Sequence, residues 1–263
     1  MYLFGEEQEI IIYDIRDLDY LVERLVSFPS FRPLNLGKSV DICVMYLDNA
    51  EFRKKFIEDS IERCPVLLYK LYKLNYFSFL EIDDELGKCK NQLSQIYFRN
   101  IGDCAFDDKI HDILIAYDQK DINSMMDYGF IPSSIEYCLK YDDIGEFRNI
   151  ISQSNHFDNI FPHWSLFEWS RRPDSHDLLS FSGFFGSIKC FKQLLMFNFS
   201  ISHEVQSLVV CSGSLELFHM VNRGCNHFSD HLCLASEFCQ MKFIQYFIEE
   251  GISINGINNR IMI

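Results

Sequence analysis

The sequence predicts an all-α fold, a solenoid of helix pairs preceded by an N-terminal helical region. The chain has 263 residues, of which 48% are hydrophobic and 15% aromatic, which is enough to bury a large core. Leu178–Leu195 has the pattern of two short helices that meet at Gly186. Small residues precede this glycine, and large apolar residues follow it at helical spacing. Strand-like alternation occurs only in Glu9–Tyr13, which is too short to support a sheet.

The N-terminal helical region covers residues 1–102. Its apolar residues recur at helical spacing in three groups: Leu18, Leu21, Val22 and Leu25; Val40, Val44 and Leu47; Phe52, Phe56 and Ile57. Proline predicts breaks from Pro29 to Pro33 and at Cys64–Pro65. A further helix is expected from about Val66 to Lys73. Glu81 to Asn91 is polar enough to be a linker or an exposed helix.

Residues 103–263 contain an approximate repeat with five units. The units are centred near Lys120, Asp142, Gly186, Gly213 and Cys239. Each carries an apolar residue two positions after its centre, and all but one carry a small residue about four positions before it. The interval from Asp142 to Gly186 is too long for one unit and predicts an insertion at about 155–175.

The last complete unit, Ala235–Asn255, ends with Gly251 as a left-handed helix cap, followed by Ile-x-Asn. Together with Phe167–Ser170 and Phe184–Lys192, this ending carries a resemblance. Residues 135–255 are similar to a divergent ankyrin-repeat family, which is catalogued as a domain of unknown function and expanded in some parasitic protists. The Thr-Pro-Leu-His signature of ordinary ankyrin units is missing. The resemblance implies degenerate ankyrin-like repeats and a non-catalytic interaction scaffold.

Charge and hydropathy limit the classes of partner. A formal net charge of -14 opposes nucleic-acid binding, which needs clustered Lys and Arg. No apolar run approaches the roughly 20 residues that cross a bilayer, so no membrane is expected. The 10 cysteines follow an N-terminus without a secretory signal and therefore suggest a reducing compartment. We expect an intracellular protein in the cytoplasm, with the nucleus as the alternative location.

Patterns that could support catalysis or a cofactor are weak. Cys225, His227, His231 and Cys233 could supply four zinc ligands, but their spacing matches no known finger. Gly37–Ser39 resembles the end of a phosphate-binding loop, but the loop's first glycine is missing, so the start of a helix is favoured. The paired carboxylates at 107–108 and 142–143 are expected to cap helices. We therefore expect no catalytic residue, no metal and no cofactor.

The insertion carries the residue types found at interface hot spots: Trp164, Trp169, Arg171 and Arg172. These four are the candidate partner-binding residues, although the tryptophans could instead clamp the insertion onto the repeats. The last unit also lacks a polar capping repeat, which would leave Phe243, Ile244 and Phe247 partly open. This end is expected to fold back the tail, to self-associate or to meet a partner.

The sequence therefore predicts a non-catalytic protein–protein interaction scaffold or adaptor, and not an enzyme. Its partner would be a protein laid on the face formed by the inner helices of the pairs. The alternative is an enzyme or enzyme-regulatory subunit with an unrecognised site in the N-terminal helical region. A purely structural spacer is the third reading.

Overall fold

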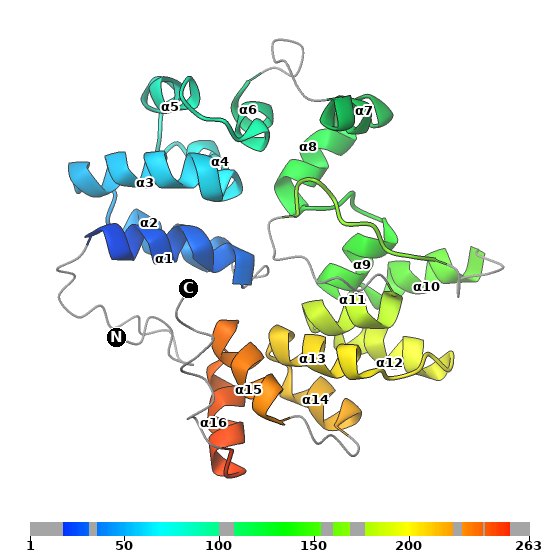
Figure 1. Ribbon diagram of the computed structural model, residues 1–263. Helices are drawn as coiled ribbons and strands as arrows, with labels where there is room; N and C mark the ends of the chain where they lie inside the picture. The colour runs from blue at the N-terminus through cyan, green and yellow to red at the C-terminus, as the bar shows by residue number, and fades with distance from the viewer. Residues whose placement is uncertain are drawn as a thin grey trace. The chain divides into compact units, whose positions relative to one another are not determined.

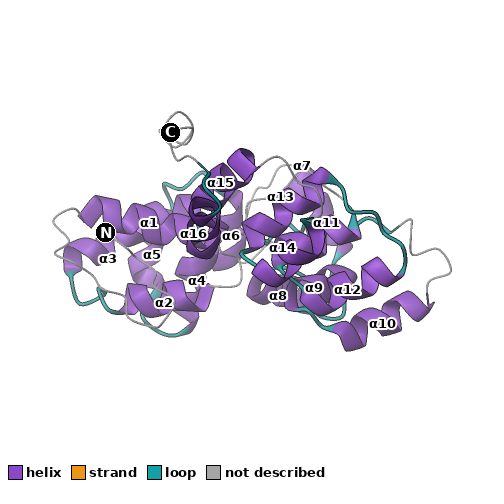
Figure 2. Ribbon diagram, turned by 90° about the horizontal axis from the view of Figure 1, so that it is seen from below, coloured by secondary structure: helices purple, strands orange, loops and turns teal. Residues whose placement is uncertain are grey.

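The computed structural model describes residues 18–31, 36–99, 108–153, 160–168, 177–222, 228–238 and 240–252. Within these ranges the chain forms 16 α-helices joined by loops and no strand (Figures 1 and 2). The all-α prediction is therefore confirmed. Residues 9–13, with their strand-like alternation, lie outside the described ranges. None of the described helices is both long enough and apolar enough to cross a membrane.

The chain divides into two compact units, Met1–Ser30 with Asn35–Ala105 and Phe31–Leu34 with Phe106–Ile263. The first unit holds α1 (Leu18–Phe31), α2 (Leu36–Val44), α3 (Ala50–Arg63), α4 (Pro65–Lys73), α5 (Phe79–Leu86) and α6 (Gln92–Phe98). Helix α3 packs against α4 and α5, and α4 packs against α2 and α6. The centre of this unit is aromatic, since the rings of Phe52, Phe56 and Phe77 stack at 5.7 and 6.1 Å.

Two N-terminal expectations agree with the structure. Helix α1 ends at Phe31, within the predicted break from Pro29 to Pro33, and α2 begins at Leu36. The polar stretch from Glu81 is in large part an exposed helix, which was one of its two expected forms. Ser78 and Glu81 form a capping box that starts α5, and Ile82 is fully buried. Helix α4 begins with Pro65, as expected.

Within its described residues the second unit forms five successive helix pairs. Four of them lie at or close to predicted centres, and the fifth centre, Cys239, lies outside the described residues. The pairs are α7 (Asp108–Ala116) with α8 (Gln119–Tyr128), α9 (Ile135–Tyr141) with α10 (Ile144–Gln153), α11 (Leu178–Phe185) with α12 (Ile188–Met196), α13 (His203–Ser212) with α14 (Leu215–Val221), and α15 (Phe228–Glu237) with α16 (Met241–Glu249). We call the first helix of each pair inner and the second outer. Figure 1 shows these pairs following one another from green to red.

The turns inside three pairs use left-handed backbone. Asp142, Gly186 and Gly213 have φ of 55, 71 and 80°, and each ends an inner helix. A left-handed residue reverses the chain within two or three residues and so lets the outer helix start at once. Gly251 also has a positive φ of 81°, as its sequence context predicted.

Neighbouring pairs contact one another in two rows. In the inner row, α11 packs against both α9 and α13, and α13 packs against α15. In the outer row, Arg148 Nε of α10 donates to Gln193 Oε1 of α12 at 3.0 Å, and Lys192 of α12 pairs with Glu216 of α14 at 2.6 Å. One continuous apolar core runs through pairs two to five. Contacts within pairs and contacts between neighbouring pairs thus share one core.

The last pair is better covered than the sequence suggested. Phe243 and Phe247 are fully buried, because both rings pack against Phe218 of α14, at 5.0 and 5.7 Å. Ile244 is half-buried. The expectation that this outer helix is left open is therefore wrong for its two phenylalanines. The apolar residues that α16 exposes are Met241 and Ile248, each 43% exposed.

Candidate functional site

The described part of the insertion, residues 160–168, lies against α11 through Trp164. This indole is half-buried, and its ring centroid lies 4.8 Å from Phe181 and 5.8 Å from both Phe184 and Phe185. It also lies 6.4 Å from the ring of Phe130. Contacts of this kind stabilise through ring geometry as well as through burial. Trp164 therefore clamps the insertion to the helix pairs, as one of the two readings of the sequence proposed.

Helix α11 is buried along its whole length, because α9, α12 and α13 pack against it in addition to Trp164. An inner helix of a repeat array usually presents some side chains to a partner. Here Trp164 covers part of that face instead, so α11 offers no side chain for binding. A partner that meets the unit at this position would therefore contact the insertion and not α11.

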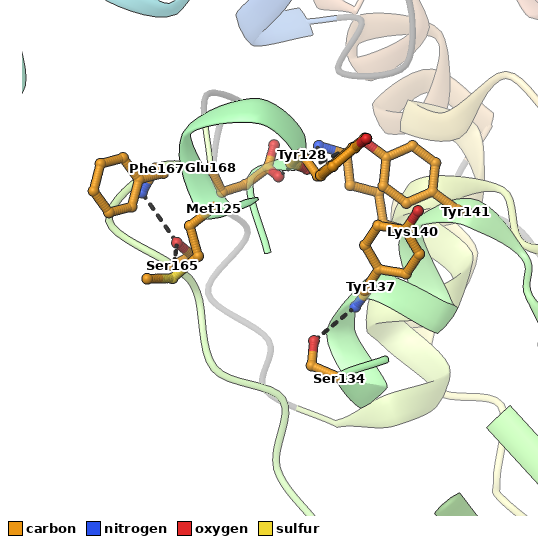
Figure 3. A network of polar contacts seen from close by, with 9 residues as sticks. All are labelled: Met125, Tyr128, Ser134, Tyr137, Lys140, Tyr141, Ser165, Phe167 and Glu168. Atoms are coloured by element: carbon orange, nitrogen blue, oxygen red, sulfur yellow. Dashed lines mark hydrogen bonds and ion pairs between the residues drawn. The ribbon is translucent and has the colours of Figure 1, made fainter. Parts of the chain in front are cut away.

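A buried ion pair fixes the end of the described insertion. Lys140 Nζ of α9 lies 2.8 Å from Glu168 Oε2, and both side chains are fully buried. Lys140 also donates to the Tyr128 carbonyl at 3.1 Å and lies near the rings of Phe130, Tyr141 and Phe185. Figure 3 draws Lys140 and Glu168 together with Tyr128 and Tyr141. Burial, followed by the charge of Glu168, raises the pKa of Tyr141, whose hydroxyl donates to the same carbonyl.

Polar contacts hold the rest of the segment. His163 N donates to Glu136 Oε1 at 2.9 Å, and Phe167 N donates to Ser165 Oγ at 3.1 Å. Phe167 is 2% exposed. Gly129, the left-handed cap of α8, has no side chain, and a Cβ there would collide with the carboxylate of Glu168. Contacts at His163 and at Glu168 thus fix the path of residues 160–168.

Between this segment and the first two helix pairs lies a cavity of about 440 Å³. It is lined by Asp112, Ala116, Tyr117, Met125, Phe130, Ile131, Ser134, Glu136, His163, Trp164, Ser165, Leu166 and Phe167. We call it the insertion cavity. Its volume lies within the range of about 300–1,000 Å³ that is usual for ligand pockets.

The insertion cavity combines an apolar floor with an acidic rim. Met125, Phe130 and Phe167 are each less than 5% exposed and form the floor. Asp112 is exposed and Glu136 is half-buried, and no lysine or arginine stands among the described residues that line the cavity. The cavity therefore favours a ligand that has an apolar part and a positive charge.

The remaining candidate residues from the sequence lie outside the described residues or do not form a site. Trp169, Arg171 and Arg172 lie outside the described residues, as do Cys225 and His227. His231 and Cys233 both lie in α15, and the described part of the chain holds no group of three or more potential metal ligands. Gly37 and Lys38 lie in the first turn of α2, which agrees with the expected helix start.

The second paired carboxylate caps helices, as expected. Asp143 Oδ1 accepts from Glu146 N at 3.1 Å at the start of α10. Asp142 Oδ1 reaches the next pair and accepts from Lys189 N and Cys190 N, both at 2.9 Å. Asp142 thus ends one helix and caps another.

Three buried cysteines, Cys43, Cys64 and Cys138, are poor candidates for nucleophiles. Cys43, Cys138 and Cys190 are fully buried, in agreement with the packing role expected for them. Burial raises the pKa of the Cys64 and Cys138 thiols to about 12 and raises that of Cys43 further. These thiols stay protonated at neutral pH, whereas a catalytic cysteine needs its thiolate.

Sequence reasoning missed Lys140, Glu168 and the insertion cavity. A lysine and a glutamate 28 positions apart look like two solvated charges, and no local pattern links them. The only sequence signal was the aromatic density of the insertion, which indicated that this segment buries itself.

Compared with known proteins, the chain matches no family model, no curated protein and no solved structure. The resemblance to the ankyrin family therefore rests on the sequence motifs alone.

Proposed function

We propose that this chain is a non-catalytic protein–protein interaction scaffold whose second unit is an ankyrin-like solenoid. The observation that carries the proposal is the contact pattern of pairs two to five, in which inner helices pack on inner helices and outer helices pair with outer helices. Such arrays present broad, rigid surfaces and bind partners without turnover. The expected partner is a protein in the cytoplasm.

The surface next to the insertion cavity is the best candidate for contact. Because α11 is buried, the inner helices cannot form an uninterrupted binding face. Exposed apolar side chains stand beside the lining residues instead: Ile115 is 69% exposed and Phe161 is 57% exposed. Large apolar residues that stay in water near a cavity are typical of a partner site.

The alternative is an enzyme or enzyme-regulatory subunit with its site in the N-terminal region. Burial raises the pKa of the Cys43 and Cys64 thiols there, so neither of these two thiols is suited to act as a nucleophile. The test below is designed for the scaffold function.

The test is quantitative affinity capture of the full-length protein from its native cells, with the bound proteins identified by mass spectrometry. The wild-type chain is compared with Ile115→Glu and Phe161→Glu. Met196→Glu is the matched control, because Met196 is 75% exposed on the outer helix α12. Unchanged circular dichroism melts would show that all variants fold.

The proposal expects one protein at near-stoichiometric yield that is retained by Met196→Glu and depleted at least about tenfold by Phe161→Glu, a change that corresponds to about 1.4 kcal/mol of binding free energy. If the wild-type chain captures no protein at near-stoichiometric yield, the scaffold proposal is wrong.

A further inference from the structure

The insertion cavity has properties that a merely imperfect packing site would lack. It measures about 440 Å³, opens to solvent at Asp112 and Ala116, and includes the carboxylates of Asp112 and Glu136 in its lining. Its walls are also held firmly, because His163 N donates to Glu136 and the ion pair of Glu168 anchors the neighbouring chain. A firmly held cavity loses little conformational entropy when it is filled.

The floor of the cavity favours a large apolar group. Met125, Phe130, Trp164 and Phe167 contribute a thioether and three aromatic rings. A leucine, methionine or aromatic side chain that leaves water for such a floor gains roughly 1.5–3 kcal/mol. The volume exceeds that of one side chain and leaves room for adjoining main chain.

The rim favours positive charge. Asp112 is exposed, and no described ion pair involves Asp112 or Glu136. The whole chain has a formal charge of -14, so its long-range field also attracts cations and repels anionic partners. A lysine or arginine beside the inserted apolar side chain would meet a carboxylate at the rim and contribute specificity.

We propose that the insertion cavity binds a segment of a partner protein that places a large apolar side chain on the floor and an adjacent Lys or Arg against Asp112 and Glu136. This inference rests on the scaffold function proposed above and names the chemistry of the partner. Ile115 and Phe161, which are exposed, stand one and two residues from lining positions in the sequence.

The test uses the full-length chain and an array of fluorescent eight-residue peptides. Each peptide carries a central Leu, Met, Phe or Trp, flanked on both sides by Arg, Gln or Glu. Binding is measured by fluorescence anisotropy at low and at physiological salt. We expect peptides flanked by Arg to bind most tightly, those flanked by Gln less tightly and those flanked by Glu least. The differences in affinity should become smaller at physiological salt, because salt screens the charges on the rim.

Two variants probe the cavity, and a third serves as the control. Ala116→Trp places a large side chain at an exposed lining position and so obstructs the mouth, while Asp112→Lys reverses one rim charge. Glu250→Lys makes the same charge change at an exposed position that ends α16, away from the lining residues. We expect at least about tenfold weaker binding in the first two variants and less than about twofold change in the control.

Three results would overturn the inference. They are no binding by any peptide, an affinity that does not depend on the charge of the flanking residues, or an affinity that Ala116→Trp leaves unchanged. Its failure is distinguishable from failure of the scaffold function. If affinity capture still yields a partner that Ala116→Trp retains, the scaffold stands and only the cavity is excluded as its binding site.

Discussion

At the scale of single residues, the position of the insertion depends on the buried pair of Lys140 and Glu168. Two full charges are withdrawn from water, and their attraction at 2.8 Å together with the Tyr128 carbonyl offsets the cost of desolvation. Such a pair adds little net stability over apolar packing but makes each partner dependent on the other. It therefore specifies where residue 168 must lie.

Removing one member of this pair should be far worse than removing both. Lys140→Met or Glu168→Leu leaves a buried charge unpaired and should lower the free energy of unfolding by about 3–5 kcal/mol. The double variant should lie within about 1 kcal/mol of the wild type, because apolar groups then fill the same space. Urea unfolding measures all three variants. Additive effects of the two single substitutions would contradict this account of the pair.

Two glycines with left-handed backbone, Gly213 and Gly251, should differ in the stability that an alanine substitution costs. Gly213 has a φ of 80°, and a Cβ there would collide with Gln240, whose side chain donates to the Cys211 carbonyl. Gly251 has a φ of 81° but nothing within 4 Å of a Cβ position. Gly251→Ala should therefore lower the free energy of unfolding only by the cost of placing alanine in a left-handed backbone conformation, about 1 kcal/mol.

Gly213→Ala should cost that same amount plus about 1–3 kcal/mol for overpacking against Gln240. Thermal unfolding of the two alanine variants side by side measures the difference. Equal costs would show that the Gln240 contact adds nothing.

At the scale of elements, polar side chains link each helix pair to the next. Asp142 ends α9 and caps the N-terminus of α12, while Ser187 donates its hydroxyl to the Leu139 carbonyl. In the last two pairs, Gln240 similarly reaches back to the carbonyl of Cys211. These links satisfy backbone groups that helix ends leave without partners, and they fix the spacing between pairs.

A graded series at Asp142 separates its two roles. Asn keeps both the left-handed backbone and an acceptor oxygen, so Asp142→Asn should cost less than about 0.5 kcal/mol. Asp142→Gly keeps the backbone but loses the cap and should cost about 1 kcal/mol. Asp142→Ala loses both and should cost about 2 kcal/mol. If the Gly variant is as stable as the Asn variant in urea unfolding, the cap contributes nothing.

Local patterns in the sequence predicted the helix pairs and missed the packing of the insertion. A glycine or aspartate at three of the turns and apolar residues at helical spacing are local signals, so the centres at Asp142, Gly186 and Gly213 could be found. The burial of α11 depends on Trp164, which arrives from a segment outside the repeat pattern. No local rule predicts that contact, because it is set by tertiary packing.

At the scale of the whole molecule, the net charge and the helical architecture both favour binding to a partner protein. The chain is strongly acidic, its described residues are helical or looped, and its second unit packs pair upon pair. These features suit a partner with a basic surface that approaches a rigid support. The central claim is that such a partner meets the second unit beside the insertion and not on the outer helices.

Hydrogen exchange of the full-length chain, alone and with its captured partner, tests this claim most directly. Mass spectrometry should show slower exchange on partner binding in residues 112–117 and 160–168, with unchanged exchange in α12. Protection confined to the N-terminal unit or to the outer helices would contradict the account and place the binding surface elsewhere.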